Sequence, residues 1–384
     1  MTGMRPVADG VVNSKKMKRK IRFRWSRIAI LNIIALTSVL FFGCQDWLSY
    51  AISQETSTLI AVGDIMLSRG VGNRINKFGA QFPFEPTADL LSHGDITAAN
   101  LETPISTLGE PMKRKEIHFR AEPDAVLGLM YAGIDVVSLA NNHALDYGDE
   151  ALFETMDILA KNGVAYVGAG MNFTAAHRAA NFVSNDIKIS FLAYSAQFYL
   201  TVEATQEKAG VAVIRSNELA ADIKQAKKWA DIVVVSFHWG WEYSDHPTDN
   251  DREIAHLAID SGANLVVGHH AHVIQGVEAY RGALICYNLG NFIFDQNNPG
   301  TRRGLILRCT YSKSGLEKAE LLPIYIHPKQ FRPELAAGRI GASILWEVKR
   351  LSRKLNTEVQ LRGDKLAIVV ISKETKNSVN SKHK

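Results

Sequence analysis

Cysteine is scarce in this chain of 384 residues, which contains only Cys44, Cys286 and Cys309. Three thiols cannot form a disulfide framework, and they are too few for a zinc site built from cysteine. Cys286 and Cys309 lie within apolar runs, so we expect both to be buried and unreactive. Any metal site in this protein should therefore use nitrogen and oxygen ligands.

Most of the chain also lacks a net positive charge. The formal net charge is +5, but the basic excess lies at the two ends, in residues 1–44 and 373–384. The remaining body, residues 45–372, is net acidic. Because nucleic-acid binding needs clustered positive charge, we predict no nucleic-acid partner.

Long apolar runs are absent except near the N-terminus, where residues 28–43 carry no charge and follow eight basic residues within 15–27. This pattern is typical of a signal peptide or a membrane anchor. We predict a cytoplasmic flank at 1–27, an anchor or signal segment at 28–45, and a body outside the cytoplasmic membrane. An uncleaved anchor is favoured, while lipidation of Cys44 after cleavage and plain secretion remain alternatives.

Short apolar runs alternate with helical patterns through the middle of the chain. This alternation predicts an α/β fold with a mostly parallel sheet. The expected strands cover 58–62, 95–99, 134–140, 231–237 and 263–267. The expected helices cover 122–132, 150–162, 216–229 and 251–261.

After residue 273 the pattern changes, because strand-like runs follow one another with only short turns between them. We predict that they form an added antiparallel sheet within the same domain, which covers 57–330. Residues 331–372 should complete this domain with a late helix and a last strand. Residues 373–384 have almost no packing side chains and should form a disordered tail. The added strands are expected at 273–280, 282–290, 303–311 and 318–326, the late helix at 342–355, and the last strand at 366–371.

Each of the five expected strands of the α/β region ends in a residue that can bind a metal ion. Because ligands collect at the carboxyl ends of parallel strands, we expect these side chains to meet at one edge of the sheet. A single histidine at the end of a strand is more often a hydrogen-bonded residue than a metal ligand. Here that explanation would have to apply independently to all five strand ends, so a shared metal site is favoured. The candidates are Asp64, Asn100 with Glu102, Asn142 with His143, His238, and His270 with His272.

Imidazole and carboxylate ligands suit zinc, manganese or iron. One such ion, or two about 4 Å apart, would bind a phosphoryl group and generate hydroxide. We expect Gly268 to free the backbone for the turn that carries His270 and His272, and His269 to matter least of the three histidines. Ligand imidazoles must be neutral, so binding should weaken below about pH 6.5.

Several neighbouring residues are weaker candidates. Glu242, four residues after His238, is expected to orient a ligand histidine through a hydrogen bond without contacting the metal itself. His118 and Arg120 could contact an anionic substrate or could be ordinary members of an edge strand. The aromatic side chains near His238 could line a polymer groove or form a packed rim, and they are Trp239, Trp241 and Tyr243.

The ordered motifs Gly-Asp, Asn-Leu-Glu, Asn-Asn-His, His-Trp-Gly-x-Glu and Gly-His-His-x-His resemble those of CapA-type poly-γ-glutamate capsule biosynthesis proteins. These proteins are similar to calcineurin-like metallophosphoesterases, and the resemblance covers roughly residues 57–300. It implies a four-layer α/β/β/α sandwich with a metal site between the strand ends of its sheets. The Gly-Asn-Phe sequence typical of the family is present around Asn291, which the resemblance places close to the site.

The resemblance also implies roles for individual residues. It makes Asp64, His238, His270 and His272 metal ligands, and it gives Asn142 and His143 a catalytic or phosphate-binding role. The chain departs from the phosphoesterase pattern at two positions. First, the phosphoesterases have an Asp-x-His motif at the first strand, and Met66 stands here in place of its histidine. Second, the aspartate of their second motif has no clear match. Asp95 lies before the expected strand, and Asn100 and Glu102 lie at the end of that strand instead. The site should therefore hold one ion tightly or two weakly.

Two classes of function fit these observations. The first is a metal-dependent hydrolase or transferase, phosphoesterase-like, that acts on a phosphorylated or polyanionic cell-envelope substrate. The second is a non-catalytic, membrane-anchored accessory subunit of a polymer synthesis and export complex. The resemblance favours capsule polymer biosynthesis for both, and the sequence leaves open whether the protein is an enzyme.

Overall fold

The computed structural model describes residues 12–13, 55–196, 201–363 and 365–368. The predicted anchor or signal segment at 28–45 and the predicted tail at 373–384 lie outside these ranges, as does nearly all of the basic flank. Within the described ranges, no helix combines the length and the apolarity needed to cross a bilayer.

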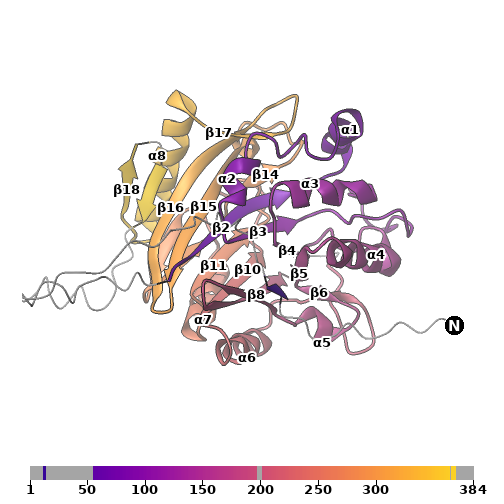
Figure 1. Ribbon diagram of the computed structural model, residues 1–384, viewed down its shortest axis with the longest axis horizontal. Helices are drawn as coiled ribbons and strands as arrows, with labels where there is room; N and C mark the ends of the chain where they lie inside the picture. The colour runs from indigo at the N-terminus through magenta and orange to yellow at the C-terminus, as the bar shows by residue number, and fades with distance from the viewer. Residues whose placement is uncertain (1–11, 14–54, 197–200, 364, 369–384) are drawn as a thin grey trace, which may run out of the picture.

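Two β-sheets form the centre of the molecule (Figure 1). The larger sheet has a parallel part, β2–β3–β4–β5, which β15, β16, β19 and β18 extend in antiparallel fashion. Two short strands join it at the side, β14 on β2 and β17 on β16. The bounds are β2 Ser57–Ile65, β3 Ile96–Leu101, β4 Val136–Ser138, β5 Ala165–Val167, β14 Asn291–Ile293, β15 Arg303–Ser312, β16 Gly315–Ile326, β17 Pro333–Leu335, β18 Val359–Arg362 and β19 Lys365–Ile368.

The smaller sheet has the order β1-β7-β8-β10-β11-β13-β12, and its central strands β8, β10, β11 and β13 are parallel. A separate pair, β6 with β9, lies outside both sheets. The bounds are β1 Val12–Asn13, β6 Ala169–Gly170, β7 Ala180–Ser184, β8 Ile187–Ser195, β9 Gly210–Val211, β10 Ile232–His238, β11 Leu265–His269, β12 Val277–Tyr280 and β13 Ala283–Cys286.

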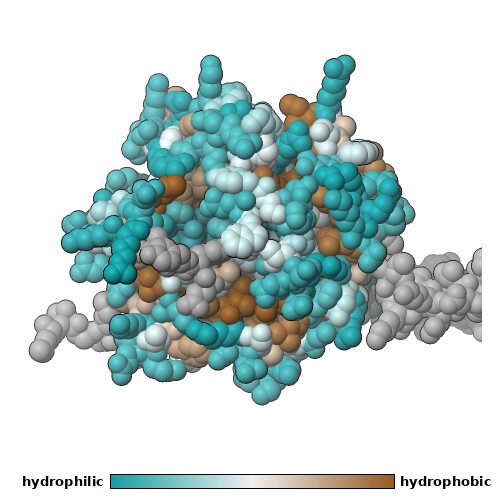
Figure 2. Space-filling model, turned by 180° about the vertical axis from the view of Figure 1, so that it is seen from behind, coloured by the Kyte–Doolittle hydropathy of each residue, from teal (hydrophilic) through white to brown (hydrophobic). Residues whose placement is uncertain are grey.

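The sheets stack on each other, with helices on both outer sides. Successive side chains of β2 point to opposite faces of the sheet, and both faces are apolar. Leu59 and Ala61 pack in the core between the sheets, and Ile60 and Val62 pack against the helices. Helices α1 to α4 cover the larger sheet and α6 and α7 cover the smaller one, whereas α8 adds Ile344 to the core between them (Figure 1). On the face in Figure 2, the described residues are mostly hydrophilic, with hydrophobic areas limited to a few patches. The bounds are α1 Arg69–Phe78, α2 Ala88–Ser92, η1 Pro123–Ala125, α3 Val126–Tyr131, α4 Gly148–Lys161, α5 Phe173–Ala176, α6 Ser216–Lys227, α7 Asp249–Asp260, η2 Gly300–Arg302 and α8 Gly338–Lys354.

The predicted alternation of strands and helices is confirmed, but the prediction of an added antiparallel sheet is wrong. Instead, β13 pairs with β11 and β15 pairs with β2, so the later strands extend the two existing sheets. The physical reason is that β2 and β11 would otherwise be edge strands with unpaired backbone groups. Cys286 and Cys309 lie buried between the sheets as predicted, and burial raises the pKa of the Cys309 thiol to about 12.

Candidate metal centre

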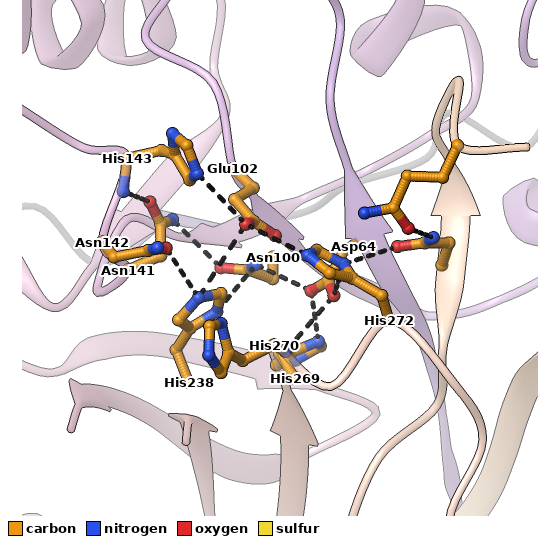
Figure 3. Close-up of polar contacts among 12 residues, drawn as sticks. Asp64, Asn100, Glu102, Asn141, Asn142, His143, His238, His269, His270 and His272 are labelled. Atoms are coloured by element: carbon orange, nitrogen blue, oxygen red, sulfur yellow. Dashed lines mark hydrogen bonds and ion pairs between the residues drawn. The ribbon is translucent and has the colours of Figure 1, made fainter. Parts of the chain in front are cut away.

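Strand register places the candidate residues next to one another. Asp64 on β2 lies opposite Asn100 on β3, and the pairing of these strands is irregular between Ala61 and Asp64, which changes the direction of the Asp64 side chain. In the smaller sheet, His238 on β10 lies opposite His269 on β11. The expectation of one sheet edge is therefore wrong, because strand ends from both sheets meet at this centre (Figure 3).

Three buried histidines stand at the end of β11 and in the loop after it, and two of them have an unusual backbone conformation. His270 and His272 have φ angles of 89° and 58°, in the left-handed region where a non-glycine residue costs about 1–3 kcal/mol. The expected role of Gly268 is wrong, because this residue sits in the strand itself. A Cβ atom at Gly268 would lie 1.9 Å from the Tyr287 carbonyl oxygen, so glycine is needed there for space. The turn is made by the histidines, and Asp64 Oδ2 helps to hold it by accepting the His270 backbone N–H at 3.3 Å.

Asp64 is fully buried and is surrounded by donors. Asn100 Nδ2 donates to its Oδ1 at 2.8 Å, His269 Nδ1 lies 3.2 Å from the same oxygen, and His272 Nδ1 lies 3.4 Å from Oδ2. Burial alone would raise the pKa of Asp64, but the hydrogen bonds from His269 and His272 hold it well below its usual value. His269, expected to matter least, is thus in direct contact with the central carboxylate.

Glu102 is the most informative residue of the centre. It is fully buried, and among the described residues neither of its carboxylate oxygens accepts a hydrogen bond. Its Oε1 lies 3.8 Å from His143 Nε2, 3.9 Å from His238 Nε2 and 3.9 Å from His272 Nε2 (Figure 3). These distances are too long for hydrogen bonds, but two ligands of one ion can be up to about 4.2 Å apart.

A metal ion therefore fits the donor set. Asp64, Glu102 and His238 each offer one ligand atom, and these atoms lie within 4.8 Å of one another. All three are buried oxygen or nitrogen donors, which suits zinc, manganese or iron. A bound cation would also satisfy the Glu102 oxygens, which would otherwise be buried at a high cost in free energy.

Burial and charge divide the histidines of the centre into two groups. Burial lowers the pKa of His238 well below its usual value and that of His270 to about 3. His272 behaves in the opposite way, because the charges of Glu102 and Asp64 outweigh its burial and raise its pKa to about 9. Burial and the nearby Asp64 charge raise the pKa of Glu102. At neutral pH, protonated His272 thus compensates for the buried carboxylates.

Asn100 and Asn142, a predicted ligand and a predicted catalytic residue, lie beside His238. Asn100 Nδ2 is 3.4 Å from His238 Nδ1, and Asn142 Oδ1 is 3.0 Å from His238 Nε2. The side-chain oxygen Oδ1 of Asn100 accepts a hydrogen bond from Asn141 Nδ2 at 3.2 Å. In this arrangement Asn100 orients Asp64 and His238, and a direct metal contact from its oxygen stays a prediction.

Two residues next to His143 were not anticipated from the sequence. Asp146 Oδ2 lies 2.7 Å from His143 Nδ1, and Lys115 Nζ donates to Asp146 Oδ1 at 2.5 Å and to the Asn142 carbonyl oxygen at 2.7 Å. The Phe119 ring stacks on His143 at 4.0 Å between centroids. The spacing of three residues between His143 and Asp146 is a signal that sequence reasoning could have used, whereas Lys115 offers none.

The remaining predicted residues lie around the centre. Asn291 Oδ1 is 2.9 Å from His272 Nδ1. Glu242 is exposed, and its charge helps to raise the pKa values of Glu102 and His272. His118 Nε2 is 2.8 Å from the Met112 carbonyl oxygen and the Arg120 guanidinium covers the Tyr147 ring, so both belong to a neighbouring surface.

Four other residues discussed in the sequence analysis lie near the centre or at the far end of β2. Trp239 is buried and donates to the Tyr287 carbonyl oxygen at 3.1 Å, whereas Trp241 is 72% exposed, so the two cannot line one groove together. Met66 is buried, and its sulfur accepts hydrogen bonds from the backbone and the hydroxyl group of Ser68. Asp95 accepts the Thr58 backbone N–H near the start of β2, at the end of the strand away from the centre.

Comparisons with known proteins agree with the resemblance. The profile of the family described as "Bacterial capsule synthesis protein PGA_cap" matches residues 58–296. The capsule biosynthesis protein CapA of Bacillus anthracis is 32% identical, covering 79% of this chain and 78% of the relative. The chain belongs to this capsule synthesis family. The PGA biosynthesis protein CapA of Bacillus subtilis is 35% identical, covering 72% of this chain and 73% of the relative.

A further relative and a solved structure are also similar to this chain. A probable polyglutamine synthesis accessory protein of Mycobacterium tuberculosis is 33% identical, covering 72% of this chain and 77% of the relative. The structure of the NAD nucleotidase of Haemophilus influenzae matches with a TM-score of 0.40 and 10% identity, covering 77% of this chain and 62% of that one. The family profile and the CapA relatives confirm the expectation of a capsule synthesis protein at the level of the family.

The first prediction concerns metal content. Changing Glu102→Gln or His238→Ala removes a central donor, and the double variant His270→Ala with His272→Ala removes two more. We expect bound metal to fall from about one ion per chain to below about 0.1, because each lost donor weakens the site at least tenfold. Elemental analysis of the purified full chain checks this result. His246→Ala is the matched control, since its side chain is 71% exposed, and metal retention equal to wild type in all variants would contradict the site.

The second prediction concerns pH. With a pKa raised to about 9, His272 is protonated at pH 7 and must lose its proton before it can bind a metal. Affinity should therefore rise about tenfold per pH unit between about pH 6 and pH 9 and then level off, rather than change near pH 6.5. Competition against a chelator of known pH dependence measures this. An affinity independent of pH over that range would contradict the assignment.

Proposed function

We propose that this protein acts in the synthesis of poly-γ-glutamate or a related capsule polymer through a metal-dependent, phosphoesterase-like site. The substrate is a phosphorylated or polyanionic cell-envelope compound, and the reaction is hydrolysis or group transfer. Membership of the capsule synthesis family supports the process. The observation that carries the chemistry is the buried Glu102 carboxylate, which has three imidazole Nε2 atoms within 3.9 Å and no hydrogen-bond donor among the described residues.

The centre would hold one or two divalent ions, of manganese, zinc or iron, through Asp64, Glu102, His238, His270 and His272. A bound ion supplies a Lewis acid and lowers the pKa of water. The two sheets supply the rigid frame, because these residues lie at the ends of strands or just after them, and the strand backbones are hydrogen-bonded to their neighbours. His270 contributes its backbone N–H to the orientation of Asp64.

His143 is the residue best placed to handle a proton. Its Nδ1 is tied to Asp146, so its Nε2 faces Glu102 and the centre. Burial lowers the pKa of His143 to about 4, although Asp146 raises it, and the imidazole is therefore neutral at pH 7. A neutral ring with its Nδ1–H donated to Asp146 has a free lone pair on Nε2, which can accept a proton or hydrogen bond. Lys115 stabilises this arrangement by holding Asp146 and the Asn142 carbonyl oxygen.

The second candidate function is a non-catalytic accessory subunit of a polymer synthesis and export complex. The observation that favours it is Met66, which stands where phosphoesterases have a ligand histidine and is engaged with Ser68. The similar protein of Mycobacterium tuberculosis is named as a probable accessory protein, which agrees with this second function. In this case the metal would stabilise the fold of the loop after β11 rather than take part in a reaction.

The third prediction separates the two functions. We expect the metal-loaded full chain to act on at least one member of a panel of phosphomonoesters, phosphodiesters and γ-glutamyl peptides. His143→Ala should reduce this activity by a factor of about 100 or more while metal content stays at the wild-type level. His246→Ala again serves as the control. If wild type is inactive throughout, and Glu102→Gln and His143→Ala still restore polymer production in a deletion strain, the accessory role holds instead.

We further propose that the body lies outside the cytoplasmic membrane and is held there by residues 28–45. The basic residues of 15–27 support this orientation, because such residues stay on the cytoplasmic side. The expected partners are the membrane and the subunits that synthesise and export the polymer.

The fourth prediction tests this topology. Protease added to cells stripped of their outer layers should digest the body, while a cytoplasmic marker protein survives. Cys44→Ser should leave the protein in the membrane fraction, since we favour an uncleaved anchor over lipidation. Protection of the body from protease would contradict the orientation, and release of the variant would favour the lipoprotein.

A further inference from the structure

A polar cavity lies between α1 and the segment that leads into η1, close to the metal centre. It has a volume of about 170 Å³. This is below the roughly 300 Å³ of a typical small-molecule pocket, so it suits one chemical group rather than a whole ligand. The polar side chains that line it are Ser68, Arg69, Asn73, Asn76, Arg120 and Glu122.

Both arginines of this cavity are held in place before any ligand arrives. The Arg69 guanidinium lies over the Phe119 ring at 5.0 Å, and that of Arg120 lies over the Tyr147 ring at 4.0 Å. A guanidinium held by its face keeps N–H groups at its edge available for an anion. Arg69 also has a φ angle of 51°, a conformation that is costly for arginine and concentrates at functional sites.

Asp295 fixes the direction of Arg69 without using all of its donors. It accepts from Arg69 Nε at 3.2 Å and from Nη2, and also from the Gly70 backbone N–H at 2.9 Å. A guanidinium has five N–H donors, so several remain for another partner. The Arg69 side chain is 40% exposed, which leaves these donors accessible.

Phe119 connects the cavity with the metal centre. Its ring lies under the guanidinium of Arg69, which lines the cavity, and stacks on His143 of the centre at 4.0 Å between centroids. Leu67, which lines the cavity, donates its backbone N–H to Thr103 Oγ1, the residue next to Glu102. A chain molecule bound at the metal centre could therefore place a neighbouring group in the cavity.

We propose that this cavity is a subsite for a carboxylate of an acidic polymer whose reacting group lies at the metal centre, an inference that rests on the proposed function. Arg69 and Arg120 bind the carboxylate, and Asn73 is placed to hydrogen-bond the amide that follows it in a γ-linked chain. Because Glu122 and Asp295 offset the two arginines, the cavity suits a singly charged carboxylate better than a doubly charged phosphate.

The test measures binding of a γ-linked decaglutamate to the full, detergent-solubilised chain by calorimetry at fixed ionic strength. The double variant Arg69→Gln with Arg120→Gln should weaken binding at least tenfold. Asn73→Trp, which fills the cavity from an exposed helix position without changing charge, should weaken it at least fivefold. Arg74→Gln is the matched control, because Arg74 lies on the same helix, contacts the Lys329 carbonyl oxygen and does not line the cavity, and it should stay within twofold.

The outcomes separate this subsite from the metal-dependent function. Metal content and thermal stability of each variant confirm that only the cavity has changed. If metal-free His238→Ala still binds decaglutamate through the two arginines, the subsite stands even though the proposed reaction fails. Equal binding by wild type and the double variant overturns the subsite, and so does an equal loss in Arg74→Gln. Binding of glycerol phosphate that depends on the arginines, with no binding of decaglutamate, overturns the carboxylate assignment.

Discussion

The burial of two carboxylates at one point between the sheets is the constraint on which the rest of this structure depends. Asp64 and Glu102 are both fully buried, and an unpaired buried carboxylate is strongly unfavourable. Asp64 is compensated by Asn100, His269 and His272, whereas Glu102 has only imidazoles at non-bonding distances. The histidines after β10 and β11 therefore supply the positive charge or the metal that the carboxylates require.

The two-sheet architecture explains why so many ligands reach one point. Strands of the larger sheet bring Asp64 and Glu102, and strands of the smaller sheet bring His238 and the loop with His270 and His272. Residues that are more than a hundred positions apart become neighbours because both sheets end at the same place. The strain of the left-handed His270 and His272 is offset by hydrogen bonds to Asp64 and Asn291, which help to hold the shape of the loop.

Much of this arrangement could be predicted from the sequence, because strand ends carry a local signal. The apolar runs before Asp64, His238 and the three histidines at 269–272 identified the strands, and the polar residues at their ends identified the centre. The separation into two sheets was implied only by the family resemblance and not by these local signals. The contact of His269 with Asp64 and the support from Lys115 could not be predicted at all. They depend on strand register and on contacts between distant segments, such as the 28 residues that separate Lys115 from His143.

X-ray absorption spectroscopy of the metal-loaded full chain tests the central claim most directly. The account predicts an ion surrounded only by nitrogen and oxygen donors, with at least two imidazoles at about 2.0–2.1 Å. A sulfur ligand would contradict this arrangement, because it would mean that Met66 or a cysteine has replaced the carboxylates and histidines described above. Failure of the wild-type protein to retain any ion under metal-replete conditions would contradict it as well.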